Sequence, residues 1–186
     1  MKTEIITTKE FADLLNKMML MGYNTDLAID SKEDVEESTE YIGDLLSELE
    51  WEDNIDDKLF LYTKIIQECL FNGEYEILMK GLELADEYRE FCTRENIVDH
   101  DIEMNIAESR CGIELNLDIN SWGTGNLDQI MEESINKYPE SPLIFLYYMD
   151  YIAGKKRYDE YINIFEKLDL ETLNNARLYE IYIGIK

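Results

Sequence analysis

Several residue types that particular folds and sites require are scarce in this chain of 186 residues. Two prolines and nine glycines leave little room for the many turns of an all-β protein, while Leu, Ile, Glu, Lys and Met are plentiful. The longest apolar run, residues 143–149, is far too short to span a bilayer. The composition therefore predicts an all-α protein that does not span a membrane.

Cysteine is also scarce, and its pattern excludes the common cysteine-based sites. Cys69, Cys92 and Cys111 are odd in number, form no CxxC pair and each fall inside a helical pattern. Buried free thiols in a reducing compartment explain them best, and metal or redox chemistry is the alternative. The first residues, MKTEIITTKEF, lack the apolar core of a secretory signal. We therefore expect a cytoplasmic protein.

Positive charge is the third shortage, with 17 Lys and Arg against 42 Asp and Glu and a net charge of −25. Long-range repulsion argues against direct binding to a nucleic-acid backbone or an anionic membrane, so a protein partner with a basic surface is the natural complement. The charge is uneven, because residues 1–150 contain 36 acidic and 11 basic residues whereas residues 151–186 contain six of each. Since 45% of the residues are hydrophobic, the acidity does not indicate disorder.

Apolar residues recur at helical spacing in nine segments that capping or breaking residues delimit. The clearest start signals are Asn54, Asp99 and the Ser141-Pro142 pair, and the clearest stop signals are Gly73 and Pro139. The predicted helices cover about residues 9–21, 31–49, 54–72, 74–95, 99–115, 127–138, 141–154, 158–168 and 173–183. Short connections between them predict antiparallel hairpins in a single domain, residues 1–186.

The segment FLYYMDYIAGKKRYDEYINIFEKL, residues 145–168, carries the strongest repeat signal. Bulky residues at Phe145, Tyr148 and Ile152 precede a turn, and Tyr158 opens the next helix. This pattern resembles a tetratricopeptide-type repeat, and residues 55–95 look similar. The pattern is divergent, since the family's small packing residues are replaced by Ile66, Leu78, Met149 and Tyr161.

This resemblance implies a short right-handed array of helical hairpins, which binds partners on a concave face and has no built-in reactive group. It divides the chain into an acidic helical pair at residues 1–53, tetratricopeptide-like hairpins at 54–168 and a capping helix at 169–186. In the family, first-helix positions line the groove, and these map onto Phe60, Thr63, Gln67, Leu146 and Asp150. The alternative is that they are ordinary helix positions, partly exposed where polar and simply core at Phe60.

Residues for catalysis are nearly absent, and we expect no enzyme activity, no cofactor and no metal. The only histidine, His100, falls at a helix start between two aspartates and is best read as a solvated first-turn residue. About 16 Å of helical rise would separate it from Cys111, too far for a nucleophile pair. The loop SWGTG lacks the lysine of a phosphate-binding loop. Its Trp122 is either a packing anchor across helices or an exposed partner contact.

The sharpest functional feature is acidic. Residues 30–57 contain 13 acids and one basic residue, Lys32. The candidate partner-binding carboxylates lie along the second predicted helix: Glu33, Glu37, Glu40, Asp44 and Glu48. A face that only keeps the protein soluble is one interpretation. The other is a surface that docks into a basic groove, where spaced carboxylates imitate phosphates.

Two functions follow from these features. The first is a non-catalytic interaction scaffold that binds a partner protein or peptide through a concave helical face and an acidic surface. The second is a nucleic-acid mimic that inhibits a DNA- or RNA-binding protein, of the anti-defence or anti-CRISPR kind that phages encode. The oligomeric state stays open, because Tyr179 and Tyr182 on the last predicted helix suit either a capping helix or a dimer seam.

Overall fold

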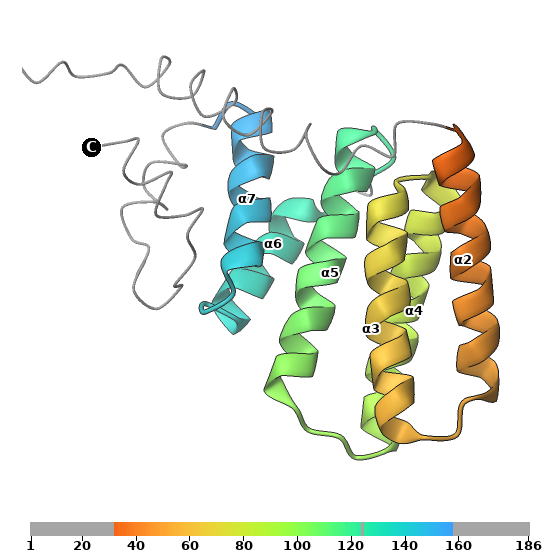
Figure 1. Cartoon of the computed structure of the whole chain (residues 1–186). Helices are drawn as coiled ribbons and strands as arrows, with labels where there is room; N and C mark the ends of the chain where they lie inside the picture. Colours follow the sequence, from red (N-terminus) through yellow and green to blue (C-terminus); the bar gives the residue numbers. More distant parts are fainter. Residues whose placement is uncertain (1–31, 124, 158–186) are drawn as a thin grey trace, which may run out of the picture. The chain divides into compact units, whose positions relative to one another are not determined.

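The computed structural model describes residues 32–123 and 125–157, and every regular element in these ranges is a helix. The helices are α2 (Lys32–Trp51), α3 (Ile55–Asn72), α4 (Tyr75–Arg94), α5 (His100–Ile119), α6 (Leu127–Lys137) and α7 (Pro142–Gly154), as Figure 1 shows. The predicted all-α class is therefore confirmed for the described part of the chain. The helices predicted at residues 9–21, 158–168 and 173–183 lie outside the described residues.

Local capping chemistry sets the helix starts, as the sequence predicts. The side chain of Asn54 accepts hydrogen bonds from the backbone N–H groups of Asp56 at 2.9 Å and Asp57 at 3.3 Å. These are backbone donors that the first turn of a helix cannot satisfy by itself. Asp99 caps α5 in the same way, and the Ser141 hydroxyl accepts from the N–H of Ile144 at 3.2 Å. The three predicted N-caps are confirmed.

Helix α5 continues to Ile119, one turn beyond the predicted end near residue 115. The side-chain amide of Asn116 donates to the carbonyl of Gly112 at 3.1 Å, and that of Asn120 donates to the carbonyl of Asn116 at 2.9 Å. Asparagine usually favours loops, but here both side chains donate to backbone carbonyls one helical turn earlier. Leu117 is buried at this end, so packing also holds the extra turn.

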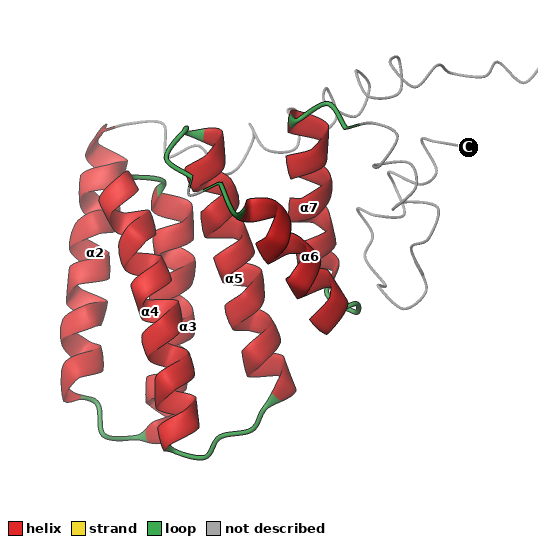
Figure 2. Ribbon diagram, turned by 180° about the vertical axis from the view of Figure 1, so that it is seen from behind, coloured by secondary structure: helices red, strands yellow, loops and turns green. Residues whose placement is uncertain are grey.

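The chain divides into two compact units, residues 29–139 and residues 1–28 with 140–186. The first unit contains α2 to α6. In it α3 packs against α2, α4 and α5, and α5 also packs against α4 and α6. Figure 1 shows α3 between α2 and α5, with α4 behind α3. In Figure 2, seen from behind, α4 lies in front of α3. Helix α3 is therefore central to this unit, and no described helix covers its remaining side.

Helix α4 lies very close to α3 and α5 at Gly81. A β-carbon at this position would lie 2.8 Å from the Cδ1 of Ile113 and 2.9 Å from the β-carbon of Cys69. A glycine is therefore the residue that this three-helix contact accepts. Nearby, the rings of Tyr62 and Tyr88 stack with centroids 4.9 Å apart, which adds aromatic packing between α3 and α4.

A buried amide joins α2 to the turn between α3 and α4. Asn72 is 5% exposed, and its side-chain nitrogen donates to the hydroxyls of Ser38 at 3.1 Å and Thr39 at 3.3 Å. Its side-chain oxygen accepts from the N–H of Glu74 at 3.3 Å. The sequence predicts Asn72 only as part of a helix stop, whereas the structure also makes it a contact between helices.

The described helix of the second unit is α7. It begins at Pro142, directly after its Ser141 cap, and its buried side chains recur at helical spacing: Ile144, Tyr148, Met149, Tyr151 and Ile152. Beyond α7, Lys156 adopts a left-handed backbone conformation with φ of 60°, and the N–H of Arg157 donates to the carbonyl of Ile152 at 2.9 Å. This turn closes the helix where the sequence predicts its end.

Candidate interaction surface

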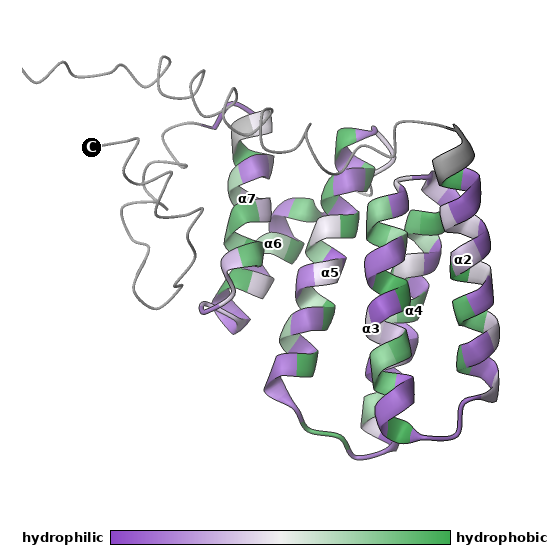
Figure 3. Cartoon of the chain, viewed as in Figure 1, coloured by the Kyte–Doolittle hydropathy of each residue, from purple (hydrophilic) through white to green (hydrophobic). Residues whose placement is uncertain are grey.

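The predicted acidic residues of α2 lie on its outer side. Glu37, Glu40, Asp44 and Glu48 are all exposed, and at 100° per residue they fall within roughly 80° of the helix circumference. We call these four residues the acidic face. Ile42 and Leu45, on the opposite side, are buried in the core, and Figure 3 shows this alternation of hydrophilic and hydrophobic residues around α2. Glu33 belongs to the first turn of α2, and its side chain is not among those described.

The four carboxylates of the acidic face share α2 with one basic residue, Lys32, whose side chain is not among those described. Within the described ranges, no hydrogen bond or ion pair joins any of its four carboxylates to another residue. The closest compensation comes from α3, where the charge of Lys64 interacts with Glu48 and Glu68. Crowded like charges on one helix repel each other. Among the described residues, Lys64 is the cation whose charge interacts with the acidic face.

The described cations of α3 to α6 already have other contacts. Lys64 lies over the ring of Tyr41, with its nitrogen 5.0 Å from the ring centroid, and other cations pair with acids on their own or neighbouring helices. These pairs are Lys80–Glu83, Arg89–Asp86, Arg94–Glu95, Arg110–Asp86 and Lys137–Glu103. The compensation of charge is therefore concentrated on α4 to α6 and nearly absent from α2.

A strip of three exposed residues and one half-buried residue, two of them aromatic, runs along α3 next to α2, on the side that no described helix covers. It consists of Phe60, Lys64, Gln67 and Phe71, which recur at spacings of four, three and four, and we call it the α3 strip. Phe60 is 64% exposed and Phe71 is 48% exposed. Lys64 connects the strip to α2, because its nitrogen lies 6.0 Å from the Phe60 ring as well as close to Tyr41. The interpretation of Phe60 as a core residue is wrong; Leu61, its neighbour, is the buried residue.

The other predicted groove residues have different surroundings. The hydroxyl of Thr63 donates to the carbonyl of Leu59 at 3.0 Å and lies 3.4 Å from the Tyr88 hydroxyl, so Thr63 faces α4. Leu146 and Asp150 are half-buried in α7, which belongs to the other unit. Of these predicted positions, Gln67 is the one that lies on the α3 strip beside Phe60.

Three exposed aromatic residues of this region were not among the sequence candidates. Trp51 is 84% exposed and Tyr41 is 39% exposed, both on α2, and Phe71 ends the α3 strip. A signal was present in the sequence, because α3 carries a second apolar stripe, Phe60 and Phe71, offset from the core stripe of Ile65 and Cys69. Spacing alone does not show which of two stripes a neighbouring helix covers.

The titratable side chains at the start of α5 and the end of α6 make contacts that stabilise the fold. His100 is exposed at the start of α5, and its ring lies 5.6 Å from that of Tyr138. The carboxylate of Glu103 accepts from the Lys137 nitrogen at 2.8 Å and from the Tyr138 hydroxyl at 3.2 Å. These hydrogen bonds lower the pKa of Glu103. The cluster fastens the beginning of α5 to the end of α6.

The three cysteines are buried free thiols, as predicted. Burial raises the pKa of Cys69 to about 12 and that of Cys111 to about 11, so neither forms the reactive thiolate at neutral pH. No group of three or more metal-binding side chains occurs in the described ranges. None of the helices that the structure describes has both the length and the apolar character needed to cross a membrane.

Trp122 packs between helices, as one of its two predicted roles requires, and it is also partly exposed. It is 44% exposed, and its ring meets that of Tyr75 edge-on with centroids 5.4 Å apart. The N–H of Trp122 donates to the carbonyl of Leu117 at 2.8 Å, which holds the residue close to the end of α5. Trp122 therefore packs the connection after α5 against the start of α4 and leaves part of its ring in solvent.

Comparisons of the chain with protein-family models, with curated proteins and with solved structures found no match. The surface chemistry of α2 and α3 is therefore the feature from which we infer a function.

Proposed function

We propose that this protein is a non-catalytic interaction scaffold that binds a partner protein with a basic surface. The contact would use the acidic face of α2 together with the adjoining α3 strip. The observation that carries the proposal is a row of exposed carboxylates that form no ion pair with another described residue, next to exposed aromatic side chains. Carboxylates select a basic partner and steer its approach, and aromatic residues supply apolar contact area.

The helix contacts support a tetratricopeptide-like array. With α3–α4 and α5–α6 as successive hairpins, the first helices α3 and α5 pack against each other, and α4 packs against α5. Stacked hairpin repeats bury their apolar faces by such neighbour contacts. In the family resembled, first helices line the binding face, and the exposed Phe60 and Gln67 lie on a first helix. The proposed binding face therefore includes the α3 strip.

Repulsion between the carboxylates of the acidic face favours binding of a cationic partner. Like charges at spacings of three or four residues cost about 0.2–0.5 kcal/mol per pair. The acidic face contains three successive pairs, from Glu37 to Glu40, from Glu40 to Asp44 and from Asp44 to Glu48. A cationic partner would relieve this repulsion while covering Phe60. The proposal thus predicts binding that has both a salt-sensitive and an apolar component.

The experiment is affinity capture from the native host with a neutralised variant and a matched control. The α2-neutral variant carries Glu37→Gln, Glu40→Gln, Asp44→Asn and Glu48→Gln. The control variant removes the same charge from exposed carboxylates of α4 and α6: Glu76→Gln, Glu87→Gln, Glu90→Gln and Glu132→Gln. We expect a protein that the wild type and the control retain at low salt, and that the α2-neutral variant loses. Equal retention by all three proteins would contradict the proposal.

A second candidate function is a nucleic-acid mimic that inhibits a DNA- or RNA-binding protein. The observation that favours it is the charge density of α2, where six exposed acids lie between Glu36 and Glu50. This is about 4 Å of helix axis per charge, close to the roughly 3.4 Å per phosphate along one DNA strand. A mimic would be displaced from its target by DNA or RNA, and its affinity would collapse as salt rises.

Substitutions in the α3 strip distinguish the two candidate functions, the scaffold and the nucleic-acid mimic. The double variant Phe60→Ala and Phe71→Ala removes both aromatic side chains and leaves every charge in place. The scaffold predicts a clear loss of affinity, whereas the mimic predicts little change. Val98→Ala is the control for loss of exposed apolar surface, because Val98 is 93% exposed and follows α4. Displacement by DNA, together with unchanged binding of the double variant, would favour the mimic.

A further inference from the structure

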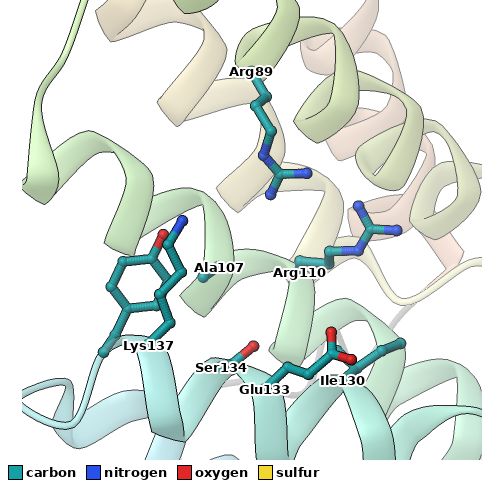
Figure 4. Close-up of a pocket in the computed structure, with 8 residues that line it drawn as sticks. Arg89, Ala107, Arg110, Ile130, Glu133, Ser134 and Lys137 are labelled. Atoms are coloured by element: carbon teal, nitrogen blue, oxygen red, sulfur yellow. The ribbon is translucent and has the colours of Figure 1, made fainter.

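A second site lies away from α2, in a pocket between α4, α5 and α6. The pocket has a volume of about 300 Å³. Figure 4 shows Arg89 of α4 and Arg110 of α5 on one side, with Ser134 and Lys137 of α6 on the other. Tyr138 and Glu133 also line it. The lining therefore brings three cations and two hydroxyl groups together from three helices and from Tyr138, which follows α6.

The charge of this lining is opposite to that of its surroundings. Residues 29–139 contain 30 acidic and 8 basic residues, whereas the pocket is lined by three basic residues and one acidic residue, Glu133. Chance placement in so acidic a unit would favour carboxylates. The pocket therefore brings together three of the unit's eight basic residues, with the acids that partly compensate them, Asp86 and Glu103, outside its lining.

The contacts of the two arginines orient them without satisfying all of their donors. One oxygen of Asp86 lies 2.6 Å from a terminal nitrogen of Arg110 and 3.5 Å from a terminal nitrogen of Arg89. A guanidinium has five N–H donors, so a single shared carboxylate leaves donors of both arginines for another acceptor. On the other side, Lys137 pairs with Glu103 at 2.8 Å. Asp86 and Glu103 thus hold these cations from outside the lining.

We propose that the pocket binds a small phosphate-bearing anion. Arg89 and Arg110 would take its oxygens with paired N–H donors, the geometry for which guanidinium groups suit phosphate. Lys137 supplies a third positive charge, and the hydroxyl of Ser134 is a further hydrogen-bond donor within the lining. The volume is at the lower end of the range for ligand pockets, which suits phosphate, pyrophosphate or a compact phosphomonoester.

Binding would also join helices that otherwise meet mainly through α5. Arg89 belongs to α4 and Lys137 to α6, and each of these helices packs against α5. An anion held by both side chains favours the folded state, because a ligand that binds only the folded chain raises its stability. This site is separate from the proposed interaction surface on α2 and α3, and either can exist without the other.

The test is isothermal titration of the full chain with inorganic phosphate, pyrophosphate and adenosine monophosphate, and with citrate as a carboxylate anion. We expect saturable one-to-one binding of at least one phosphate compound and a raised melting temperature. Arg110→Gln should weaken this binding by at least about tenfold, the loss expected for one charge-assisted contact. Lys80→Gln is the matched control, since it removes a cation of α4 that does not line the pocket.

Glu133→Gln keeps the test decisive if Arg110→Gln does not fold. This variant removes the one carboxylate of the lining, so phosphate affinity should rise several-fold. Four results would overturn the proposal: no saturable binding of any phosphate compound, binding of citrate alone, unchanged affinity in Glu133→Gln, or an equal loss in Arg110→Gln and Lys80→Gln.

Discussion

At the scale of single residues, Gly81 shows how tightly the three central helices meet. Its missing side chain lets α4 approach Ile113 of α5 and Cys69 of α3. Gly43, on α2, is also helical, but a β-carbon at this position would have no neighbouring atom within 4 Å. The two glycines therefore have the same backbone role and opposite surroundings, and they make a matched pair.

Gly81→Ala should destabilise the protein although alanine favours helices. The gain in helix propensity is about 1 kcal/mol, whereas the new β-carbon would clash with Ile113 and Cys69, and overpacking of a core costs about 1–3 kcal/mol. Gly43→Ala should raise the free energy of unfolding by up to about 1 kcal/mol. Urea unfolding of both variants measures the difference. Stabilisation by Gly81→Ala would show that α4 is not held this closely.

Glu114 gives a prediction about pH. It is 5% exposed and forms no hydrogen bond or ion pair with another residue of the described ranges. Burial raises the pKa of this carboxyl, and the charge of Arg110 lowers it by less. The folded state therefore holds the proton more tightly than the unfolded chain. Its contribution to stability is greatest below the unfolded pKa and falls as pH rises through the folded pKa.

Glu114→Met should therefore stabilise the protein at neutral pH, by about 1–3 kcal/mol, since it removes a buried carboxylate that has no hydrogen bond or ion pair with another described residue. The gain should shrink below about pH 4, where the wild-type carboxyl is protonated in both states. Glu87→Met, at an exposed position of α4, is the control and should show no such pH dependence. Chemical unfolding at the two pH values checks this. A gain that does not change with pH would refute the assignment.

The sequence predicts the structural roles of some residues and not of others. Asn54, Asp99 and Ser141 could be predicted as caps, because each bonds to backbone within three residues of itself. Asn72 could not be predicted as a contact between helices, because its partner Ser38 is 34 residues away. Nor could the exposure of Phe60, since it depends on which side of α3 the neighbouring helices cover.

At the scale of elements, α2 is the helix in which burial of apolar side chains stabilises the fold while repulsion between carboxylates destabilises it. Its buried residues Ile42 and Leu45 belong to the shared core, and α3 is the helix against which it mainly packs. Its outer side carries the acidic face. Such a helix gains stability from one side and loses some through repulsion on the other.

The α2-neutral variant should therefore be more stable than the wild type. Three pairs of like charges at about 0.2–0.5 kcal/mol each predict a gain of about 1 kcal/mol at low salt, reduced by the loss of the attraction between Glu48 and Lys64. The gain should diminish in about 0.5 M salt, where screening already weakens the repulsion. Urea unfolding at both salt concentrations measures it. A destabilised variant would mean that these carboxylates have structural partners.

The elements also show where pattern reasoning succeeds. The described helices α2 to α7 correspond to predicted segments, because each combines an apolar stripe with a start or stop signal. The end of α5 is the largest discrepancy, since Asn116 and Asn120 resemble breakers in sequence and bond back to the helix in the structure. The acidic row could also be predicted, because exposure of one side of α2 follows from burial of the other.

At the scale of the whole molecule, charge is the property that distinguishes this chain. Its net charge is −25, and within the described ranges the cations of α3 to α6 have acidic or aromatic contacts. The acidic face is left with little compensation. The sequence predicts this excess of charge, but only the fold shows that it adjoins the α3 strip and that three cations gather in the pocket between α4, α5 and α6.

The most direct test of the central claim is the affinity of the captured partner, purified, for the wild type, the α2-neutral variant and the control variant, titrated at low and moderately high salt. The interaction surface predicts that the α2-neutral variant binds at least about tenfold more weakly at low salt. It also predicts a reduced dependence on salt for that variant, while the control binds within about twofold of the wild type. Wild-type affinity and salt dependence in the α2-neutral variant would contradict it.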